Sequence, residues 1–174
     1  MDMYESRIRR LEQQVGALRA GKPARIVHAE YTTNTAQAMT NNDYTLLDYE
    51  DKIIDTHGAV TVGASWKFTA PIPGPYNIAA ASKLAADAGW DIGERVSLEL
   101  YKNGASVKIL GYNSAFDNAG GESISMFASG AKTIYLNTYD YISFYFFQDS
   151  GGAINLNGLA TNNWCSITLV GESR

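Results

Sequence analysis

Apolar residues near the start of the chain follow a heptad spacing. Six of them lie alternately three and four residues apart, as a and d positions do: Met1, Tyr4, Ile8, Leu11, Val15 and Leu18. We expect residues 1–20 to form a coiled-coil helix that trimerises and anchors the chain, and residues 21–27 to form a linker beginning at a Gly21 cap. The alternative is a short amphipathic helix packed on its own domain. Because the seam covers fewer than three heptads, its stability must come from the domain that follows.

After residue 25 the hydrophobic period changes from helical to alternating. Short alternating runs separated by turn residues are typical of a β-sandwich or jelly roll. We expect one head domain over residues 28–174, with one helical turn possible in 79–88. The Asn103-Gly104 pair predicts a two-residue hairpin turn, and 118–121 and 149–152 predict two further turns. The predicted strands are 26–31, 44–48, 52–55, 59–62, 65–70, 76–82, 94–102, 106–111, 122–128, 132–137, 140–148, 152–157 and 164–170.

A proline-rich corner separates two of these strands. The run is Trp66-Lys-Phe-Thr-Ala-Pro-Ile-Pro-Gly-Pro-Tyr-Asn-Ile78, which holds three of the four prolines of the chain. Trp66, Phe68 and Ala70 alternate on one face before the corner, as do Tyr76, Ile78 and Ala80 after it. Each proline fixes its own φ and lacks an amide donor, so the corner is stiff. We predict a β-hairpin here.

The segment 140–147 is apolar on both faces. Ile142, Phe144 and Phe146 form one face, and Tyr141, Tyr145 and Phe147 form the other. A strand of this kind must be covered on both sides. Either a neighbouring subunit or a second layer of the same subunit could cover the tyrosine face.

Four segments carry a family likeness in a fixed order: the proline corner within 53–78, then 96–104, 136–142 and 164–170. Together they resemble the C1q/tumour-necrosis-factor jelly-roll superfamily. The resemblance implies an antiparallel jelly-roll sandwich and a homotrimer, with Ile8, Leu11, Val15, Leu18, Tyr141, Tyr145 and Phe147 as candidate interface residues. Two departures are Tyr139, where the family has Gly, and the absence of Phe-Ser-Gly in the last strand. A heptad stalk replaces the collagen repeat, as in phage and bacterial versions of the fold.

Charge and hydropathy narrow the set of partners. The net charge is −4, but residues 1–25 carry six basic and three acidic residues, so the remainder is at −7. An acidic head argues against nucleic acid as a partner. A basic stalk could lie on an acidic surface, although such a charge balance is more often only the solvated face of a helix. No apolar run is long enough to cross a membrane, and no signal peptide is evident. We therefore expect a cytosolic protein or one that leaves its cell inside a virion.

Residues capable of catalysis are scattered. His28 and His57 lie in no metal-ligand or triad spacing, and Cys165 is expected to be a small core residue. The sequence therefore predicts a protein that is not an enzyme and has no cofactor. Asp87 and Asp91 flank a loop and are candidates for a calcium site, because calcium takes loop carboxylates and carbonyls.

Loop aromatics are the predicted ligand-binding residues. Trp90, Tyr112 and Phe116 lie among Gly, Asn and Asp, a setting that suits sugar stacking and hydrogen bonding. The alternative is that they tuck beneath the loops. The function predicted from the sequence is a trimeric virion appendage, either a phage head or tail fibre or a capsid decoration protein. Its stalk would attach to a capsid or tail protein, and its head would adhere to a host-surface glycan or protein. The alternative is a bacterial surface or spore-coat protein, or a cytokine-like protein-binding module.

Overall fold

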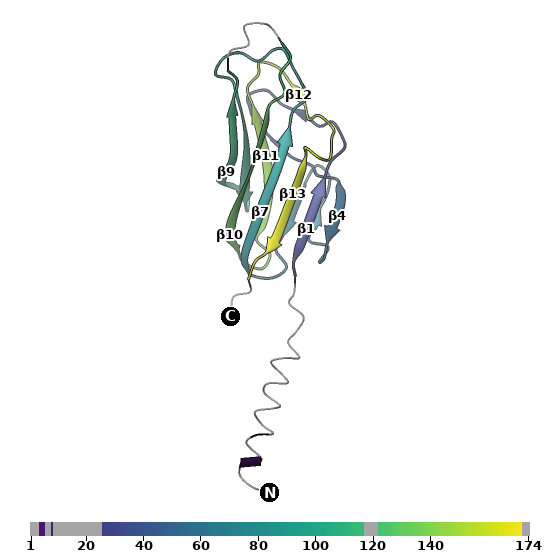
Figure 1. Ribbon diagram of the computed structural model, residues 1–174, viewed down its shortest axis with the longest axis vertical. Helices are drawn as coiled ribbons and strands as arrows, with labels where there is room; N and C mark the ends of the chain where they lie inside the picture. The colour runs from purple at the N-terminus through teal and green to yellow at the C-terminus, as the bar shows by residue number, and fades with distance from the viewer. Residues whose placement is uncertain (1–3, 6–7, 9–25, 117–121, 172–174) are drawn as a thin grey trace.

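The computed structural model describes residues 4–5, 8, 26–116 and 122–171. Its head is a sandwich of two five-stranded antiparallel sheets (Figure 1). The β7 sheet has the order β10(Phe127–Leu136)-β7(Gly74–Lys83)-β13(Trp164–Leu169)-β1(His28–Thr32)-β4(Asp51–Asp55). The β11 sheet has the order β5(Val60–Thr61)-β6(Lys67–Thr69)-β11(Tyr141–Gln148)-β8(Arg95–Lys102)-β9(Ala105–Ser114). β2(Ala38–Met39) pairs with β12(Ile154–Asn155), and β3(Asp43–Leu46) lies outside the two sheets.

The all-β sandwich predicted for the head is confirmed, with three local corrections. The two strands expected at 122–128 and 132–137 are one strand, β10, which continues through Gly130. β2 was missed, because two residues are too few to show alternation. β7 extends to Lys83 and no helical turn follows it, because Leu84 and Asp87 form isolated β-bridges instead. The predicted stalk lies outside the described residues except for Tyr4, Glu5 and Ile8, so it stays a prediction.

The proline corner is not the hairpin that the sequence predicted. β6 pairs with β5 and β11, whereas β7 pairs with β10 and β13, so the corner carries the chain from one sheet to the other. The reason is that prolines cannot donate the ladder bonds that a hairpin needs. The Tyr76 hydroxyl closes the corner by donating to the Ile72 carbonyl at 2.6 Å.

Aromatic rings fill the space between the sheets. Trp66 lies at the centre, 5.6 Å from the ring of Tyr49 and 5.5 Å from that of Phe144. Its indole Nε1 donates to the Tyr49 carbonyl at 3.0 Å, so the polar end of this buried ring is satisfied. The alternation predicted around the corner and in 140–147 is confirmed, because its inward members are buried: Trp66, Phe68, Ala70, Tyr76, Ile78, Ala80, Ile142, Phe144 and Phe146.

The two sheets touch where their edge strands β9 and β10 meet. A methyl group on Gly130 would overlap the Leu110 carbonyl, and one on Gly111 would overlap the Ser129 backbone. Both positions therefore require glycine for close backbone approach. This contact closes the sandwich on one side.

Asp140 joins the turn at Asn103-Gly104 to the turn that runs from Asn137 to Asp140 itself. Asn103 and Gly104 both have positive φ, which confirms the predicted hairpin turn between β8 and β9. The Asp140 carboxylate accepts hydrogen bonds from Lys102 Nζ at 2.8 Å and from Asn103 Nδ2 at 2.8 Å. The hydrogen bond from Lys102, with help from that of Asn103, holds the pKa of Asp140 well below its usual range. Tyr139, just before it, has a φ of 72° and thus adopts the conformation of the glycine that the family pattern places there.

Candidate binding surface

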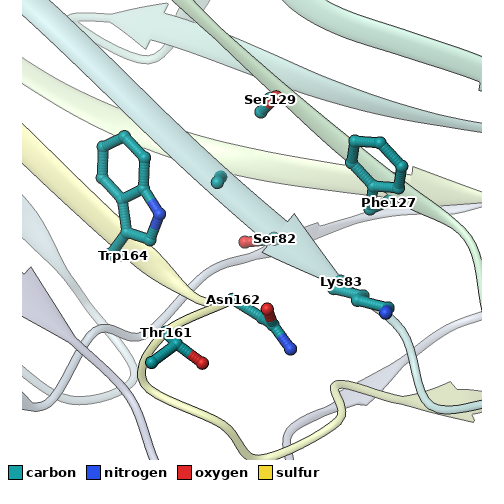
Figure 2. Close-up of a pocket in the computed structure, with 8 residues that line it drawn as sticks. Ser82, Lys83, Phe127, Ser129, Thr161, Asn162 and Trp164 are labelled. Atoms are coloured by element: carbon teal, nitrogen blue, oxygen red, sulfur yellow. The ribbon is translucent and has the colours of Figure 1, made fainter.

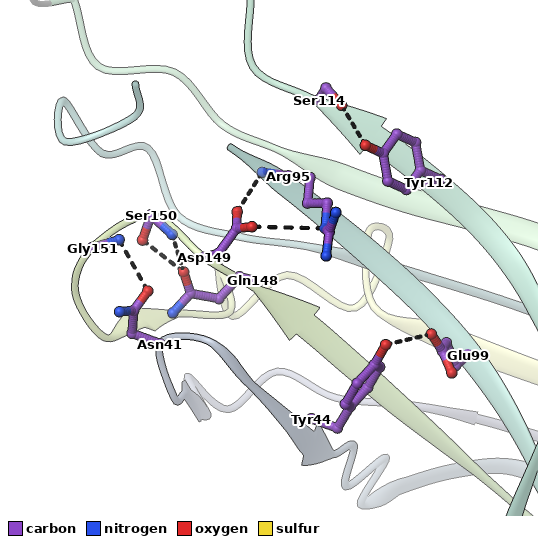
Figure 3. Close-up of polar contacts among 10 residues, drawn as sticks. All are labelled: Asn41, Tyr44, Arg95, Glu99, Tyr112, Ser114, Gln148, Asp149, Ser150 and Gly151. Atoms are coloured by element: carbon purple, nitrogen blue, oxygen red, sulfur yellow. Dashed lines mark hydrogen bonds and ion pairs between the residues drawn. The ribbon is translucent and has the colours of Figure 1, made fainter. Parts of the chain in front are cut away.

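The outer face of the β11 sheet is covered by the chain itself. Tyr44 of β3 lies across it, with its ring 5.1 Å from that of Phe147 and 6.5 Å from that of Tyr101. Its hydroxyl donates to the Glu99 carboxylate at 2.7 Å (Figure 3). Ser106 Oγ donates to the same carboxylate at 2.8 Å. Glu99 is only 5% exposed. The hydrogen bond between the Tyr44 hydroxyl and Glu99 raises the pKa of Tyr44.

Backbone contacts fix the segment that carries Tyr44. The Asn42 amide donates to the Gln148 carbonyl, and the Leu47 amide donates to the Phe144 carbonyl. Beyond β11, the Gly151 amide donates to Asn41 Oδ1 at 2.9 Å (Figure 3). β3 is therefore held against β11 on both sides of Tyr44.

The three predicted interface residues of β11 all lie on this covered face. Phe147 is 7% exposed beneath Tyr44 and the Arg95 guanidinium, and the Tyr145 ring lies 4.2 Å from that of Tyr101. Tyr141 lies under the Lys67 ammonium, 5.3 Å from ring centroid to nitrogen. The alternative that a second layer of the same subunit covers the tyrosine face thus accounts for these side chains within one chain. Their contact with a neighbouring subunit stays a prediction.

The outer face of the β7 sheet is different, because no strand among the described residues lies across it. Alternation and register define its outward positions on the three strands β10, β7 and β13, all of them described. Lys83 is the one charged residue among these positions, whereas an antiparallel sheet facing water ordinarily alternates to polar and charged side chains. We name this set the bare face: Phe127, Ser129, Ala131, Thr133, Tyr135, Pro75, Asn77, Ala79, Ala81, Lys83, Trp164, Ser166 and Thr168.

A hollow of about 390 Å³ lies at one end of the bare face. Figure 2 shows Trp164 of β13 and Phe127 of β10 on either side of it, with β7 between them. Its polar lining comes from Ser82, Lys83, Ser129, Thr161 and Asn162. It lies at the end of the sheet opposite to the His28–Thr168 pair, because Trp164 pairs with Ala81.

The loop aromatics predicted as ligand contacts do not form one site. Trp90 is 1% exposed, so its ring cannot stack on a ligand, and the alternative that it tucks beneath its loop is correct for this residue. Tyr112 and Phe116 are 58% and 81% exposed, and their role in binding stays a prediction. Trp164 was missed as a site residue. The sequence does indicate its orientation, because alternation along the strand puts Trp164 on the face opposite to the buried Cys165 and Ile167.

The described residues offer little for metal or nucleophilic chemistry. They contain no group of three or more His, Cys, Asp or Glu placed to hold a metal ion. Asp87 Oδ1 accepts a hydrogen bond from the Gly89 amide at 2.7 Å, and Asp91 is exposed. Cys165 is a core residue, as predicted, and burial raises the pKa of its thiol well above the ordinary value. A thiol of this kind is inert as a nucleophile. In the part of the chain that the structure describes, no helix is long and apolar enough to span a membrane.

Solved structures share this architecture, although no family model and no curated protein matches the chain. Eiger TNF from S. frugiperda superposes with a TM-score of 0.63 at 11% identity, over 86% of this chain and 95% of that one. The globular domain of zebrafish complement 1qA protein superposes with a TM-score of 0.56 at 16% identity, over 84% of this chain and 98% of that one. Murine APRIL superposes with a TM-score of 0.60 at 9% identity, over 84% of this chain and 100% of that one.

The chain has the C1q/TNF-like jelly-roll fold. Identities this low show the fold alone, so function must be argued from the surfaces described above. The resemblance seen in the four sequence segments is confirmed at the level of the fold.

Proposed function

We propose that the chain is a non-enzymatic, homotrimeric binding module, displayed on a virion as a head or tail fibre or a capsid decoration protein. The observation that carries the trimer is the bare face. Protein interfaces are depleted of charge in their core, and the bare face carries one charge across three strands. Small side chains at its centre, such as Ala79, Ala131 and Ser166, would let a second subunit approach closely.

A threefold ring needs two different surfaces that fit each other. We assign the second surface to the exposed flank of β9, where Val107 and Ile109 are 47% and 50% exposed. An edge strand with exposed β-branched side chains is a liability in a single chain, because it is free to pair or pack elsewhere. Contact with the bare face of a neighbour would cover it.

The virion role rests on the arrangement along the sequence. A heptad segment precedes a head rich in Tyr, Asn, Gly and Ser, a composition that suits display and adhesion rather than catalysis. In this proposal the heptad segment registers three chains and attaches to a capsid or tail protein. The head then contacts a glycan or protein of the host surface.

Light scattering on the purified full chain tests the assembly. The expected mass is three times 18.9 kDa. A mass of one or two chains at micromolar concentration would overturn the trimer. For the adhesion role, labelled protein should bind host cells in a saturable way, and failure to bind would leave passive decoration as the role.

A cytokine-like ligand is the second candidate. The similarity in fold to a TNF and to APRIL favours it. Detection of the chain in purified virions would decide for the first proposal, and its absence there would decide against it.

A further inference from the structure

We propose that the hollow between Trp164 and Phe127 binds a sugar ring that carries a carboxylate. The site deepens the proposed binding role and rests on it. It requires that the hollow, at one end of the bare face, stays outside the subunit contact, which we place at the centre of that face around Ala79, Ala131 and Ser166. We name it the Trp164 hollow, lined by Ala81, Ser82, Lys83, Phe127, Ser129, Thr161, Asn162 and Trp164.

Two aromatic walls and a small floor give the hollow its shape. Trp164 and Phe127 stand on strands that are two sheet spacings, roughly 10 Å, apart. Between them Ala81 pairs with Trp164 on one side and with Ser129 on the other. A large side chain at position 81 would fill the space, whereas the methyl group of Ala81 leaves it open. Aromatic walls suit the apolar C–H faces of a sugar ring.

The polar rim is anchored but has unused hydrogen-bonding groups. Buried Asn163 holds the loop, because its Oδ1 accepts from the Lys83 amide and its Nδ2 donates to Asn157 Oδ1. In contrast, the side chains of Lys83, Ser129, Thr161 and Asn162 have no hydrogen-bond or ion-pair partner among the described residues. Together they offer an ammonium, two hydroxyls and an amide, which match the hydroxyls and carboxylate of an acidic sugar.

The charge of the rim favours an anion. Lys83 is the one charged lining residue, in a head whose residues from 26 onward sum to −7. An unpaired ammonium in a partly enclosed, partly apolar hollow attracts a carboxylate more strongly than one exposed to bulk water does. A neutral sugar would leave this ammonium without a charged partner.

A second hollow of similar volume, about 400 Å³, serves as the contrast. Its polar groups are already used within the chain. Gln37 Nε2 donates to the Leu46 carbonyl, Gln37 Oε1 accepts from the Asp48 amide, and Asp48 Oδ1 accepts from the Gly63 amide. Its only charged lining residues are the acids Asp48 and Glu50. The Trp164 hollow is thus the better candidate for a ligand, and for an anionic one.

Tryptophan fluorescence of the full chain, titrated with glucuronate and with N-acetylneuraminate, tests the site. Trp66 and Trp90 are each 1% exposed, so a change in emission on binding reports Trp164. We expect a saturable change with at least one acid sugar and an affinity at least about tenfold weaker for glucose. The Trp164→Phe variant should lose the signal.

Lys83→Met should weaken binding about tenfold, the effect of losing one charged hydrogen bond. Lys132→Met, which removes an exposed lysine of the same sheet outside the hollow, should bind as the parent does. No saturable change with either acid sugar, an equal response to glucose, or equal binding by both lysine variants would overturn the site. The mass of each sample separates the two proposals. A trimer that binds neither acid sugar overturns the site alone, and a monomer that binds one overturns the trimer alone.

Discussion

The two outer faces of the sandwich differ in whether the chain itself covers them. On the β11 sheet, aromatic side chains and a buried carboxylate are covered by Tyr44 from the same chain. On the bare face of the β7 sheet most outward side chains are small or weakly polar, the larger ones are Phe127, Tyr135 and Trp164, and Lys83 carries the one charge. No strand of the described chain lies across them. A face closed from within needs no partner, whereas a low-charge face left open is a surface for other molecules. The comparison directs attention away from the tyrosines of β11 and toward β7, β10 and β13.

Tyr44→Ala should break the covered face and have the largest effect. It removes the ring over Phe147 and leaves the Glu99 carboxylate with one donor fewer. Because Tyr44 is itself 41% exposed, we expect a cost of about 2–3 kcal/mol in the free energy of unfolding, below that of truncating a fully buried ring. Tyr135→Ala on the bare face should cost less than about 1 kcal/mol. Urea unfolding measures the loss of stability in each variant. Both variants also carry Ala131→Glu, so that association of subunits does not contribute. Equal costs would show that Tyr44 is not a structural cover.

Gly130→Ala should separate the two sheets where β9 and β10 touch. The added methyl group would meet the Leu110 carbonyl, which is backbone and cannot rotate away, so we expect a loss of about 2 kcal/mol. Gly152→Ala is the matched control, because its methyl group would meet nothing within 4 Å. If thermal unfolding gives the two variants the same midpoint, the close approach does not limit stability.

Asp140→Asn should weaken the link between the two turns by about 1–2 kcal/mol near neutral pH. Because the pKa of Asp140 is lowered in the folded chain, its contribution is fully present above the unfolded value of 3.8 and is lost as the pH falls toward the folded value. The difference from the parent should therefore narrow between about pH 5 and pH 2. Asp91→Asn, at an exposed carboxylate, is the control. A difference that does not change with pH would argue against the ion pair with Lys102.

Tyr139→Gly should give the smallest effect, a gain of about 0.5–1 kcal/mol. Tyr139 is 82% exposed and has a positive φ, which costs an L-residue more than glycine, although glycine loses more chain entropy on folding. Tyr139→Ala removes the ring but keeps the Cβ, so it should show no gain. Equal stability of the two variants would assign the effect to the ring.

Local pattern was enough to predict the core but not the way its surfaces are covered. Period-two alternation identified Trp66, Phe68 and Phe144 as inward, because each strand displays its own faces. The contact of Tyr44 with Glu99 joins positions 55 residues apart, and no local pattern shows it. The proline corner was recognised as stiff, but alternation does not tell which sheet the following strand joins.

The candidate site was beyond sequence reasoning for the same reason. The Trp164 hollow depends on strand register, which places Trp164 beside Ala81 and Phe127 beside Lys83. Alternation did put Trp164 on the face opposite to Cys165. It could not show that a small residue would lie next to it, nor that Trp90 would be buried beneath its loop.

The central claim is that the bare face is a subunit interface, and the mass of two glutamate variants tests it most directly. Ala131 is exposed at the centre of the bare face, and Ala64 is exposed in the connection between β5 and β6. Light scattering should give three times 18.9 kDa for the parent and for Ala64→Glu, and a mass approaching one chain for Ala131→Glu. A parent of one chain, or an Ala131→Glu protein that remains a full trimer, would contradict the account.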